Sequence, residues 1–472
     1  MGDRSVTRYC GPDLARVGAG LPVAAYCDEI TTALHGGRAV IVAPPGTGKT
    51  TFVPPLVASR CSGRVIVTQP RRVAARAAAR RLATLTGTRP GEFASHTVHG
   101  ESTTTRDTKV EFVTTGVLLR RLLSDPDLTG VDAVVLDEVH ERHLDADLVV
   151  AMVCEVAQLR DDLTIVAMSA TVDSSGWAAF LGGVEPAPVV EVASALHELE
   201  VEWAPAAGAA VESRGVSREF LGHLGTVTVD ALDRHTEGSA LVFVPGAREV
   251  DHVVADLRSR LAGIDVVGLS GAMSAREQDH ALSDPGNVRR VIVSTAVAES
   301  SLTVPGVRLV VDSGLSREPR LDRGRGMTGL VTVRESRASA VQRAGRAARL
   351  GPGVAVRCLR AQDWAGMNAD PTPEVDHADL VAPLLSLAVW GSPRGEGMAL
   401  PTPLPQDQVA AAEEELRDLG AVDAEGRITA RGRHLATFPL DPRLVRALTD
   451  GAAIVGSRRC AEIAAMLGLE DG

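Results

Sequence analysis

The stretch VAPPGTGKTT, from Val42 to Thr51, has the residue types of a phosphate-binding loop. It matches the pattern A-x-x-x-x-G-K-T, with Ala43 where the first glycine often stands, and an apolar run precedes it. Glycines let backbone N–H groups turn towards phosphate oxygens, and the lysine brings a positive charge to them. The sequence therefore predicts a site for a nucleoside triphosphate, with the Thr50 hydroxyl available to a Mg²⁺ ion.

A second chemical group follows another apolar run in VVLDEVHER, from Val134 to Arg142. The run predicts a strand that delivers Asp137 and Glu138 to its end. With a triphosphate bound, Asp137 would hold Mg²⁺ and Glu138 would polarise the attacking water. Two surface carboxylates at a strand end are the alternative, which the upstream phosphate loop weakens. The two motifs together predict hydrolysis of a nucleoside triphosphate.

These residues need a scaffold, and the sequence predicts a parallel sheet. Short Val/Ile-rich runs alternate with helix-compatible segments, which is the pattern of a doubly wound α/β fold with functional groups at the carboxyl ends of strands. The runs of the first unit are RAVIVAP, GRVIVTQP, KVEFVTT, DAVVLDE and LTIVAMSAT. The pattern restarts after FLGGVEPAP with SALVFVPG, DVVGLSG, VRRVIVSTA and GVRLVVDSG. From about Pro371 the pattern is helical, and GRITARGRHLA is compatible with a short hairpin.

Composition limits the class of protein. A chain of 472 residues with 45 % hydrophobic residues predicts two to four domains with buried cores. The net charge of −11 excludes a general attraction to nucleic acid or anionic lipid, so nucleic acid must be bound by local basic patches. Six scattered cysteines favour free thiols over disulfides or a zinc site. With no secretion signal and no apolar run of about 20 residues, we expect a cytoplasmic, soluble protein that binds no membrane.

Six further stretches determine the use of the triphosphate. They are DEVH, Ser169-Ala170-Thr171, QPRRVAARAAARR, VEFVTTGVLLRRL, STAVAESSLTVPGVRLVVDSGLSR and QRAGRAARLGPG. In this order and spacing they resemble superfamily 2 helicases of the DEAH-box class, and most closely the bacterial HrpB-type ATP-dependent helicases. The resemblance covers nearly the whole chain.

The resemblance implies an α/β fold with two tandem RecA-like P-loop domains and a small, mostly α-helical, winged-helix-like module. The expected domains are 1–184, 185–368, 369–440 and, as the start of a helical ratchet-like domain, 441–472. Proteins of this type continue past that point, so we expect hydrolysis to survive better than processive unwinding. RLDRGRGMTGLVTVRES resembles the β-hairpin that parts a duplex, with an ordinary exposed hairpin as the alternative.

The resemblance also implies roles for matching residues. The ATP phosphates would be bound by Gly46, Thr47, Gly48, Lys49, Thr50 and Thr51. Mg²⁺ would be held by Thr50, Asp137 and Glu138. Two arginine fingers and a glutamine from the second unit would complete the catalytic set, which is Lys49, Glu138, Gln342, Arg346 and Arg349. The nucleotide state would be coupled through His140, Ser169 and Thr171.

Contacts to nucleic acid follow from the same resemblance. Sugar and phosphate groups would be contacted by Arg71, Arg72, Thr114, Thr115, Gly116, Gly246, Arg248 and Thr295. Glu299 and Ser301 lie in the motif that touches both nucleotide and nucleic acid, whereas a solvated helix face is the favoured interpretation of Arg76, Arg80 and Arg81. Ala348 replaces a glycine that the family often has, and would cost on the order of 1 kcal/mol if its φ were positive.

The implied function is an ATP-dependent helicase that moves 3′→5′ and hydrolyses ATP at the cleft between the two RecA-like domains. Its partner would be single-stranded RNA or a 3′-tailed duplex, with DNA as the alternative to RNA. A nucleotide-gated RNA clamp that hydrolyses ATP without processive unwinding is the second hypothesis. A degenerate ATPase used for protein assembly is the third, and the complete catalytic set argues against it.

Overall fold

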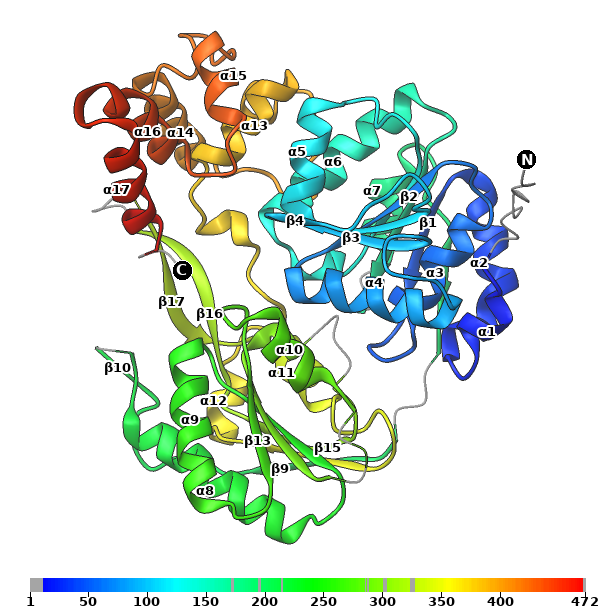
Figure 1. Ribbon diagram of the computed structural model, residues 1–472, viewed down its shortest axis with the longest axis vertical. Coiled ribbons are helices and arrows are strands. Elements are labelled where there is room, and N and C mark those ends of the chain that lie inside the picture. The colour runs from blue at the N-terminus through cyan, green and yellow to red at the C-terminus, as the bar shows by residue number, and fades with distance from the viewer. Residues whose placement is uncertain are drawn as a thin grey trace, which may run out of the picture. The chain divides into compact units, whose positions relative to one another are not determined.

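The computed structural model describes the chain in two compact units (Figure 1). The first unit comprises Met1–Leu118, Asp127–His140 and Val156–Ala195, and the second comprises Leu119–Pro126, Glu141–Glu155 and Leu196–Gly472. The residues described are 12–170, 174–193, 197–213, 215–284, 286, 288–299, 304–322 and 327–469.

The first unit is built on an eight-stranded sheet of order β4-β3-β5-β2-β6-β7-β1-β8. Its strands are β1 (Arg38–Val42), β2 (Arg64–Gln69), β3 (Ala94–Val98), β4 (Glu101–Ser102), β5 (Val110–Thr114), β6 (Val131–Leu136), β7 (Thr164–Ser169) and β8 (Val189–Glu191). All neighbours pair in parallel except β3 and β4. The Val/Ile-rich strands are buried almost throughout, as expected for a parallel sheet covered on both faces.

Helices accompany these strands, and all but the first two connect one strand to the next by a crossover. They are α1 (Leu14–Gly18), α2 (Cys27–Ala33), α3 (Lys49–Ala58), α4 (Arg72–Thr86), α5 (Thr115–Ser124), α6 (Leu144–Leu159) and α7 (Ser174–Gly182). Connections through α3 and α4 run towards one edge of the sheet and those through α7 towards the other. Because such crossovers are right-handed, α3 and α4 cover one face and α7 covers the opposite face (Figure 1).

The second unit contains a six-stranded, wholly parallel sheet of order β13-β14-β12-β15-β18-β9. Its strands are β9 (Leu199–Trp203), β12 (Ser239–Phe243), β13 (Asp265–Leu269), β14 (Arg290–Ser294), β15 (Val307–Asp312) and β18 (Gly353–Arg357). The associated helices are α8 (Arg218–Arg234), α9 (Ala247–Arg260), α10 (Ala275–Leu282), α11 (Arg337–Ala344) and α12 (Ala361–Ala365). The same handedness places α8 and α9 on one face, and α10 and α11 on the other.

Two antiparallel pairs lie outside this sheet. The short strands β10 (Val211–Glu212) and β11 (Gly215–Val216) form one pair. The other is a long hairpin of β16 (Leu315–Asp322) and β17 (Met327–Arg334), with Leu315 opposite Arg334. The hairpin predicted from RLDRGRGMTGLVTVRES is therefore present, while residues 323–326 lie outside the described part of the chain.

The C-terminal part of the second unit is helical, as expected. It contains α13 (Val381–Trp390), α14 (Gln406–Asp418), α15 (Ala430–Ala436), α16 (Pro442–Val455) and α17 (Ser457–Leu469). The prediction of a hairpin at GRITARGRHLA is wrong for most of these residues. Only an isolated bridge joins Val422 to Ile428, and the remaining residues form α15 because the Thr429 hydroxyl caps its first turn.

The expected domain boundary at residue 184 precedes β8, which pairs with β1 in the first sheet. The first sheet thus includes a strand from beyond that boundary. The strand has only three residues and follows a Pro-containing loop, so it gives a weak periodic pattern.

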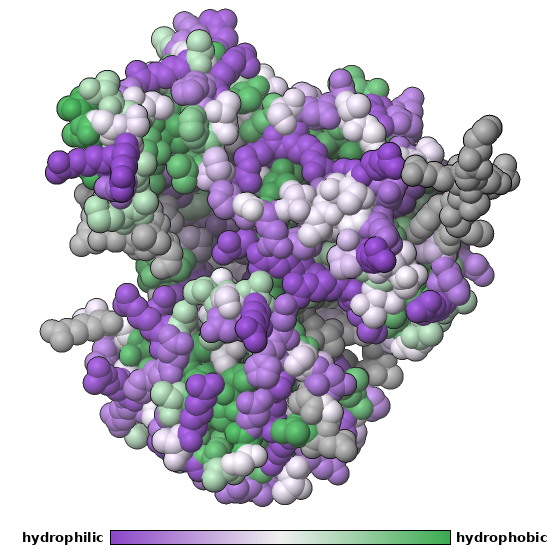
Figure 2. All heavy atoms as spheres, in the orientation of Figure 1, coloured by the Kyte–Doolittle hydropathy of each residue, from purple (hydrophilic) through white to green (hydrophobic). Residues whose placement is uncertain are grey.

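Hydrophobic side chains are exposed on the last two helices. In Figure 2, hydrophobic and hydrophilic atoms both lie over α16 and α17, and the exposed hydrophobic residues of these helices are Ile454, Val455, Ile463 and Met466. Among the described residues, no helix has both the length and the apolar character required to cross a bilayer.

Candidate nucleotide-binding and hydrolysis site

The predicted phosphate-binding loop connects β1 to α3. Gly46 and Gly48 have φ of 92° and 88°, in the left-handed region that favours glycine. Helix α3 begins at Lys49, so its first N–H groups and positive dipole end face the loop. A Cβ atom at Gly48 would lie 2.8 Å from Cδ1 of Leu21. Backbone angle and space thus both require glycine at this position.

The loop lysine is paired with the predicted catalytic glutamate. Lys49 Nζ lies 3.3 Å from Glu138 Oε1, and their side chains are only 6 % and 3 % exposed. A buried charge is tolerated only when it is paired, so each of these two groups stabilises the other. The Thr50 hydroxyl donates to Asp137 Oδ2 at 2.6 Å. The loop of β1 and the end of β6 therefore form one buried polar centre.

Two residues from the end of β2 complete the surroundings of Asp137. The side-chain amide of Gln69 donates to Asp137 Oδ2 at 2.7 Å, and the Asp137 N–H donates to Thr68 Oγ1 at 3.1 Å. The parallel register of β2 and β6, with Thr68 opposite Leu136, positions them. Neither Gln69 nor Thr68 is among the site residues predicted from the sequence. The available signal was VTQP, in which polar residues end a buried strand beside the strand that carries Asp137.

Burial strongly affects the carboxyl group of Asp137. Burial raises the pKa of Asp137, the neighbouring Glu138 charge raises it further, and Lys49, Thr50 and Gln69 oppose the rise. This carboxylate is therefore held in a site where a cation would be strongly favoured. Hydroxyl and carboxylate oxygens are the ligands that Mg²⁺ prefers. The buried Glu138 Oε2 has no hydrogen-bond partner among the described residues. The donor set fits a Mg²⁺ ion held by Thr50 and Asp137.

His140 links the end of β6 to the end of β7. The Ala170 N–H donates to His140 Nδ1 at 3.3 Å, which leaves Nδ1 as an acceptor. Its distance of 3.6 Å from Glu138 Oε2 is accordingly a close approach without a hydrogen bond. Ser169 is buried, and its carbonyl accepts from the Ala43 N–H at 2.9 Å. The structure thus brings His140 and Ser169 to the site, whereas Thr171 lies outside the described residues.

The predicted arginine fingers belong to the second unit. Arg346 is 3 % exposed, and its guanidinium donates to the carbonyl oxygen of Glu299, with Nε at 2.9 Å. Gln342 lies on α11, and both Gln342 and Arg349 are half-buried. Ala348 is not among the residues with positive φ, so alanine causes no backbone strain at the position where the family often has glycine.

A buried arginine supports this segment. Arg343 donates from Nε to Glu299 Oε2 at 2.8 Å and from Nη1 to Asp312 Oδ1 at 3.1 Å. It also pairs with Glu335, and its guanidinium lies 5.0 Å from the centre of the Phe243 ring. Burial raises the pKa of Glu335 although Arg343 opposes the rise. Glu299 thus connects Arg343 to Arg346, a relation that the sequence analysis missed because a pattern does not show side-chain partners.

Comparisons with known proteins relate this chain to helicases. The DEAD/DEAH box helicase family matches residues 27–177, the helicase conserved C-terminal domain matches 224–351, and the winged-helix helicase associated domain (HA2) matches 412–440. The ATP-dependent RNA helicase HrpB of Escherichia coli is 37 % identical over 95 % of this chain and 54 % of its own length. The chain belongs to the HrpB-type DEAH-box helicases.

Other relatives support this membership. The probable ATP-dependent RNA helicase DHX34 of Homo sapiens is 33 % identical over 93 % of this chain and 39 % of its own length. The crystal structure of the Escherichia coli DEAH/RHA helicase HrpB superimposes with a TM-score of 0.86 at 36 % identity, over 95 % of this chain and 56 % of that chain. The present chain thus spans about half the length of these relatives. The expected RecA-like α/β fold with a helical module is confirmed.

The nucleic-acid residues predicted for this DEAH-box chain lie at strand ends. In the first unit, β2 leads to Arg71 and Arg72 and β5 leads to Thr114, Thr115 and Gly116, and these strands pair with Gln69 opposite Thr114. In the second unit, β12 leads to Gly246 and Arg248 and β14 leads to Thr295, and these strands also pair. Each unit therefore carries one cluster. Ser301 lies outside the described residues.

The three arginines along α4 differ in their surroundings. Arg76 pairs with Glu101 at 2.6 Å, whereas Arg80 and Arg81 are exposed. The solvated-face interpretation therefore fits Arg81 best. Among the described cysteines, Cys27, Cys61, Cys154, Cys358 and Cys460 carry free thiols.

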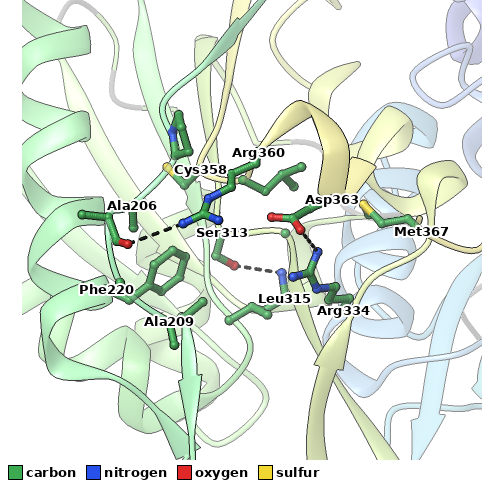
Figure 3. Close-up of a pocket in the computed structure, with 16 residues that line it drawn as sticks. Ala206, Ala209, Phe220, Ser313, Leu315, Arg334, Cys358, Arg360, Asp363 and Met367 are labelled. Atoms are coloured by element: carbon green, nitrogen blue, oxygen red, sulfur yellow. Dashed lines mark hydrogen bonds and ion pairs between the residues drawn. The ribbon is translucent and has the colours of Figure 1, made fainter. Parts of the chain in front are cut away.

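The second unit also contains a pocket of about 350 Å³ that includes none of the predicted site residues. Figure 3 shows Arg334 and Asp363 facing each other beside it, and they form an ion pair at 3.2 Å. Burial raises the pKa of the Cys358 thiol at its wall far above the usual range, which disfavours the nucleophilic thiolate. The charged groups labelled in the pocket are already engaged with protein atoms, and we assign it no role.

Proposed function

We propose that this chain is the ATP-hydrolysing core of a helicase that moves 3′→5′ along RNA. The observation that carries the proposal is the buried centre in which Lys49 pairs with Glu138 and Thr50 with Asp137. Since Lys49 lies at the start of α3, it is placed to bind the β- and γ-phosphates of ATP. Once Lys49 binds phosphate, Glu138 is released to orient and polarise the attacking water.

In this proposal the remaining predicted residues have distinct tasks. Gly46, Thr47, Gly48 and Thr51 supply backbone or hydroxyl groups to the phosphates, and Thr50 and Asp137, with Glu138 nearby, would hold Mg²⁺. The bound ion would neutralise charge between the β- and γ-phosphates. His140, Ser169 and Thr171 would couple the nucleotide state to the rest of the first unit.

The second unit would complete the centre when the units close on ATP. Gln342, Arg346 and Arg349 would then stabilise the charge of the transition state, an effect worth about 10³–10⁵ in rate. If each unit binds the strand through its own cluster, closing and opening would move the enzyme along that strand. The cleft between the two units is thus the proposed place of hydrolysis.

RNA is the proposed substrate because the relatives are named ATP-dependent RNA helicases. The residues predicted to touch the strand would contact sugar and phosphate, which positions a strand without reading its sequence. A cytoplasmic location is part of the proposal, and the free thiols of the described cysteines support it.

The first test uses the small number of lysines. The sequence contains only Lys49 and Lys109, so Lys109→Ala is a matched control for Lys49→Ala. Lys109 binds the Ser62 carbonyl and belongs to no motif. We expect phosphate release to be abolished in Lys49→Ala and retained in Lys109→Ala. Equal turnover in both variants would refute the assignment of the loop.

The second part of the test concerns the nucleic acid on which the enzyme acts. Phosphate release and strand displacement should be compared on matched 3′-tailed RNA and DNA duplexes at one stated salt concentration, because such binding depends on salt. Displacement of the RNA duplex is expected. ATP hydrolysis with an intact duplex would instead indicate the nucleotide-gated clamp.

A further inference from the structure

Glu374 lies more than two hundred residues after α6 in the sequence, yet it caps that helix. Its Oε2 accepts from the backbone N–H of Leu144, the first residue of α6, at 2.9 Å. Helix caps are usually supplied by the residue just before the helix. A carboxylate at this position is doubly favoured, because it satisfies a free N–H and faces the positive end of the helix dipole.

The same carboxylate holds the residue before the helix. Glu374 Oε2 lies 3.3 Å from Nδ1 of His143, whose Nε2 lies 2.9 Å from Glu141 Oε2. Partial burial favours the neutral imidazole, but hydrogen bonds and charges from Glu141 and Glu374 outweigh it and raise the pKa of His143 to about 10. At neutral pH, His143 is therefore a cation held between two carboxylates.

The backbone of the segment is held as well. The Glu374 N–H donates to the Arg142 carbonyl at 3.3 Å. Arg142 has φ of 56°, which a non-glycine residue adopts at an energetic cost unless its surroundings enforce it. Its guanidinium donates to the Thr402 hydroxyl at 2.7 Å, and that hydroxyl donates to Asp147 Oδ2 at 2.8 Å. These contacts hold the backbone of Arg142 at this positive φ.

The contacts of residues 141–144 matter because this segment directly follows the predicted site residues Glu138 and His140. Glu141 directly follows His140, and Glu138 also has φ of 56°. A chain fixed at residues 141–144 has few conformations left for the residues just before it. We propose that Glu374 is a positioning residue for ATP hydrolysis, which fixes Glu138 and His140 by holding the backbone that follows them. The inference rests on the proposed function and adds to it a residue outside the ATPase motifs.

The competing explanation is that Glu374 only attaches the C-terminal region to α6 and has no effect on hydrolysis. The chain offers a matched control for this explanation. Trp390 donates from Nε1 to Glu155 Oε2 at 2.6 Å and thus joins the same C-terminal region to the later part of α6. Trp390→Phe removes that hydrogen bond without touching residues 141–144. Glu374→Gln retains an oxygen that accepts from the Leu144 N–H but removes the charge opposite His143.

The experiment measures kcat and KM for ATP in the presence of single-stranded RNA, together with thermal melting and hydrogen exchange. For Glu374→Ala we expect kcat to fall by roughly ten- to a hundredfold, since misplacing a catalytic group by about 1 Å has effects of this size. KM for ATP should change by less than about threefold, because the phosphate loop is untouched. Glu374→Gln should recover most of kcat, and Trp390→Phe should match the wild type.

Hydrogen exchange provides a readout that does not depend on activity. Amides 142–147 should exchange faster in Glu374→Ala than in Trp390→Phe. Equal kcat in these two variants, or a kcat loss with unchanged exchange of these amides, would overturn the inference. Absence of hydrolysis in the wild type would instead refute the proposed function, and this inference with it.

Discussion

At the scale of single residues, the loop glycine Gly48 combines two constraints that are usually separate. Its φ of 88° strains any other residue, and the side chain of Leu21 occupies the place of a Cβ atom. The proposed phosphate-binding loop is therefore fixed by packing from outside as well as by its own backbone. The pattern A-x-x-x-x-G-K-T indicates a glycine here but does not reveal Leu21.

Gly100 separates these two constraints experimentally. It has φ of 77°, but a Cβ atom there would meet nothing within 4 Å. Gly100→Ala should lower the free energy of unfolding by about 1 kcal/mol through backbone strain alone. Gly48→Ala should lower it further and weaken ATP binding at least tenfold. Urea unfolding and titration with a fluorescent nucleotide check both points, and equal effects of the two substitutions would contradict the role of Leu21.

At the scale of elements, strand ends and helix starts carry the site. The first residue of α4, Arg72, is exposed beside the carboxyl end of β2, whereas Arg81 lies later on the same helix. Only the former is predicted to touch a phosphate. The carboxyl ends of neighbouring parallel strands lie at one edge of a sheet. They therefore bring together residues that are far apart in the sequence.

The salt dependence of RNA binding distinguishes the two arginines. The logarithm of the binding constant falls linearly with the logarithm of the salt concentration, and loss of one phosphate contact makes this slope less steep by about 1. We expect this reduction, with weaker binding, in Arg72→Ala and no change in Arg81→Ala. Binding isotherms of single-stranded RNA at several salt concentrations measure it. Identical slopes for Arg72→Ala and the wild type would remove Arg72 from the interface.

Prediction from sequence succeeded for elements with a strong pattern. All nine Val/Ile-rich runs form strands, because a parallel strand buried on both faces must be apolar throughout. Strand β3 was missed because it contains Ser95 and His96, which are buried but hydrogen-bonded to threonines of a neighbouring loop. Edge strand β9 was missed because its sequence, LEVEW, is half polar.

The residues of the candidate site also fall into those that the sequence predicts and those that it does not. Motif residues such as Lys49 and Asp137 were predictable because their chemistry requires fixed types at fixed spacing. Gln69, Arg343 and Glu374 were not, since each acts through a partner distant in the sequence. A pattern along the chain does not show which strands pair or which loop reaches a helix end.

At the scale of the whole molecule, the proposed hydrolysis of ATP requires two units to share one reaction. Lys49 and Glu138 belong to the first unit, and Arg346 and Arg349 belong to the second. In the second unit, Glu299 links the buried Arg343 to Arg346, so the proposed finger segment is tied to a buried ion-pair cluster. Neither unit alone contains the complete catalytic set proposed for hydrolysis.

The most direct test of this claim is the RNA-stimulated steady-state ATPase of Arg349→Ala. Arg427, an exposed arginine that pairs with Asp423 and Glu425, provides the control Arg427→Ala. We predict that Arg349→Ala lowers kcat by about 10³-fold or more, with KM for ATP and melting temperature close to those of the control. A kcat within a few-fold of that of Arg427→Ala would contradict a catalytic centre shared between the units.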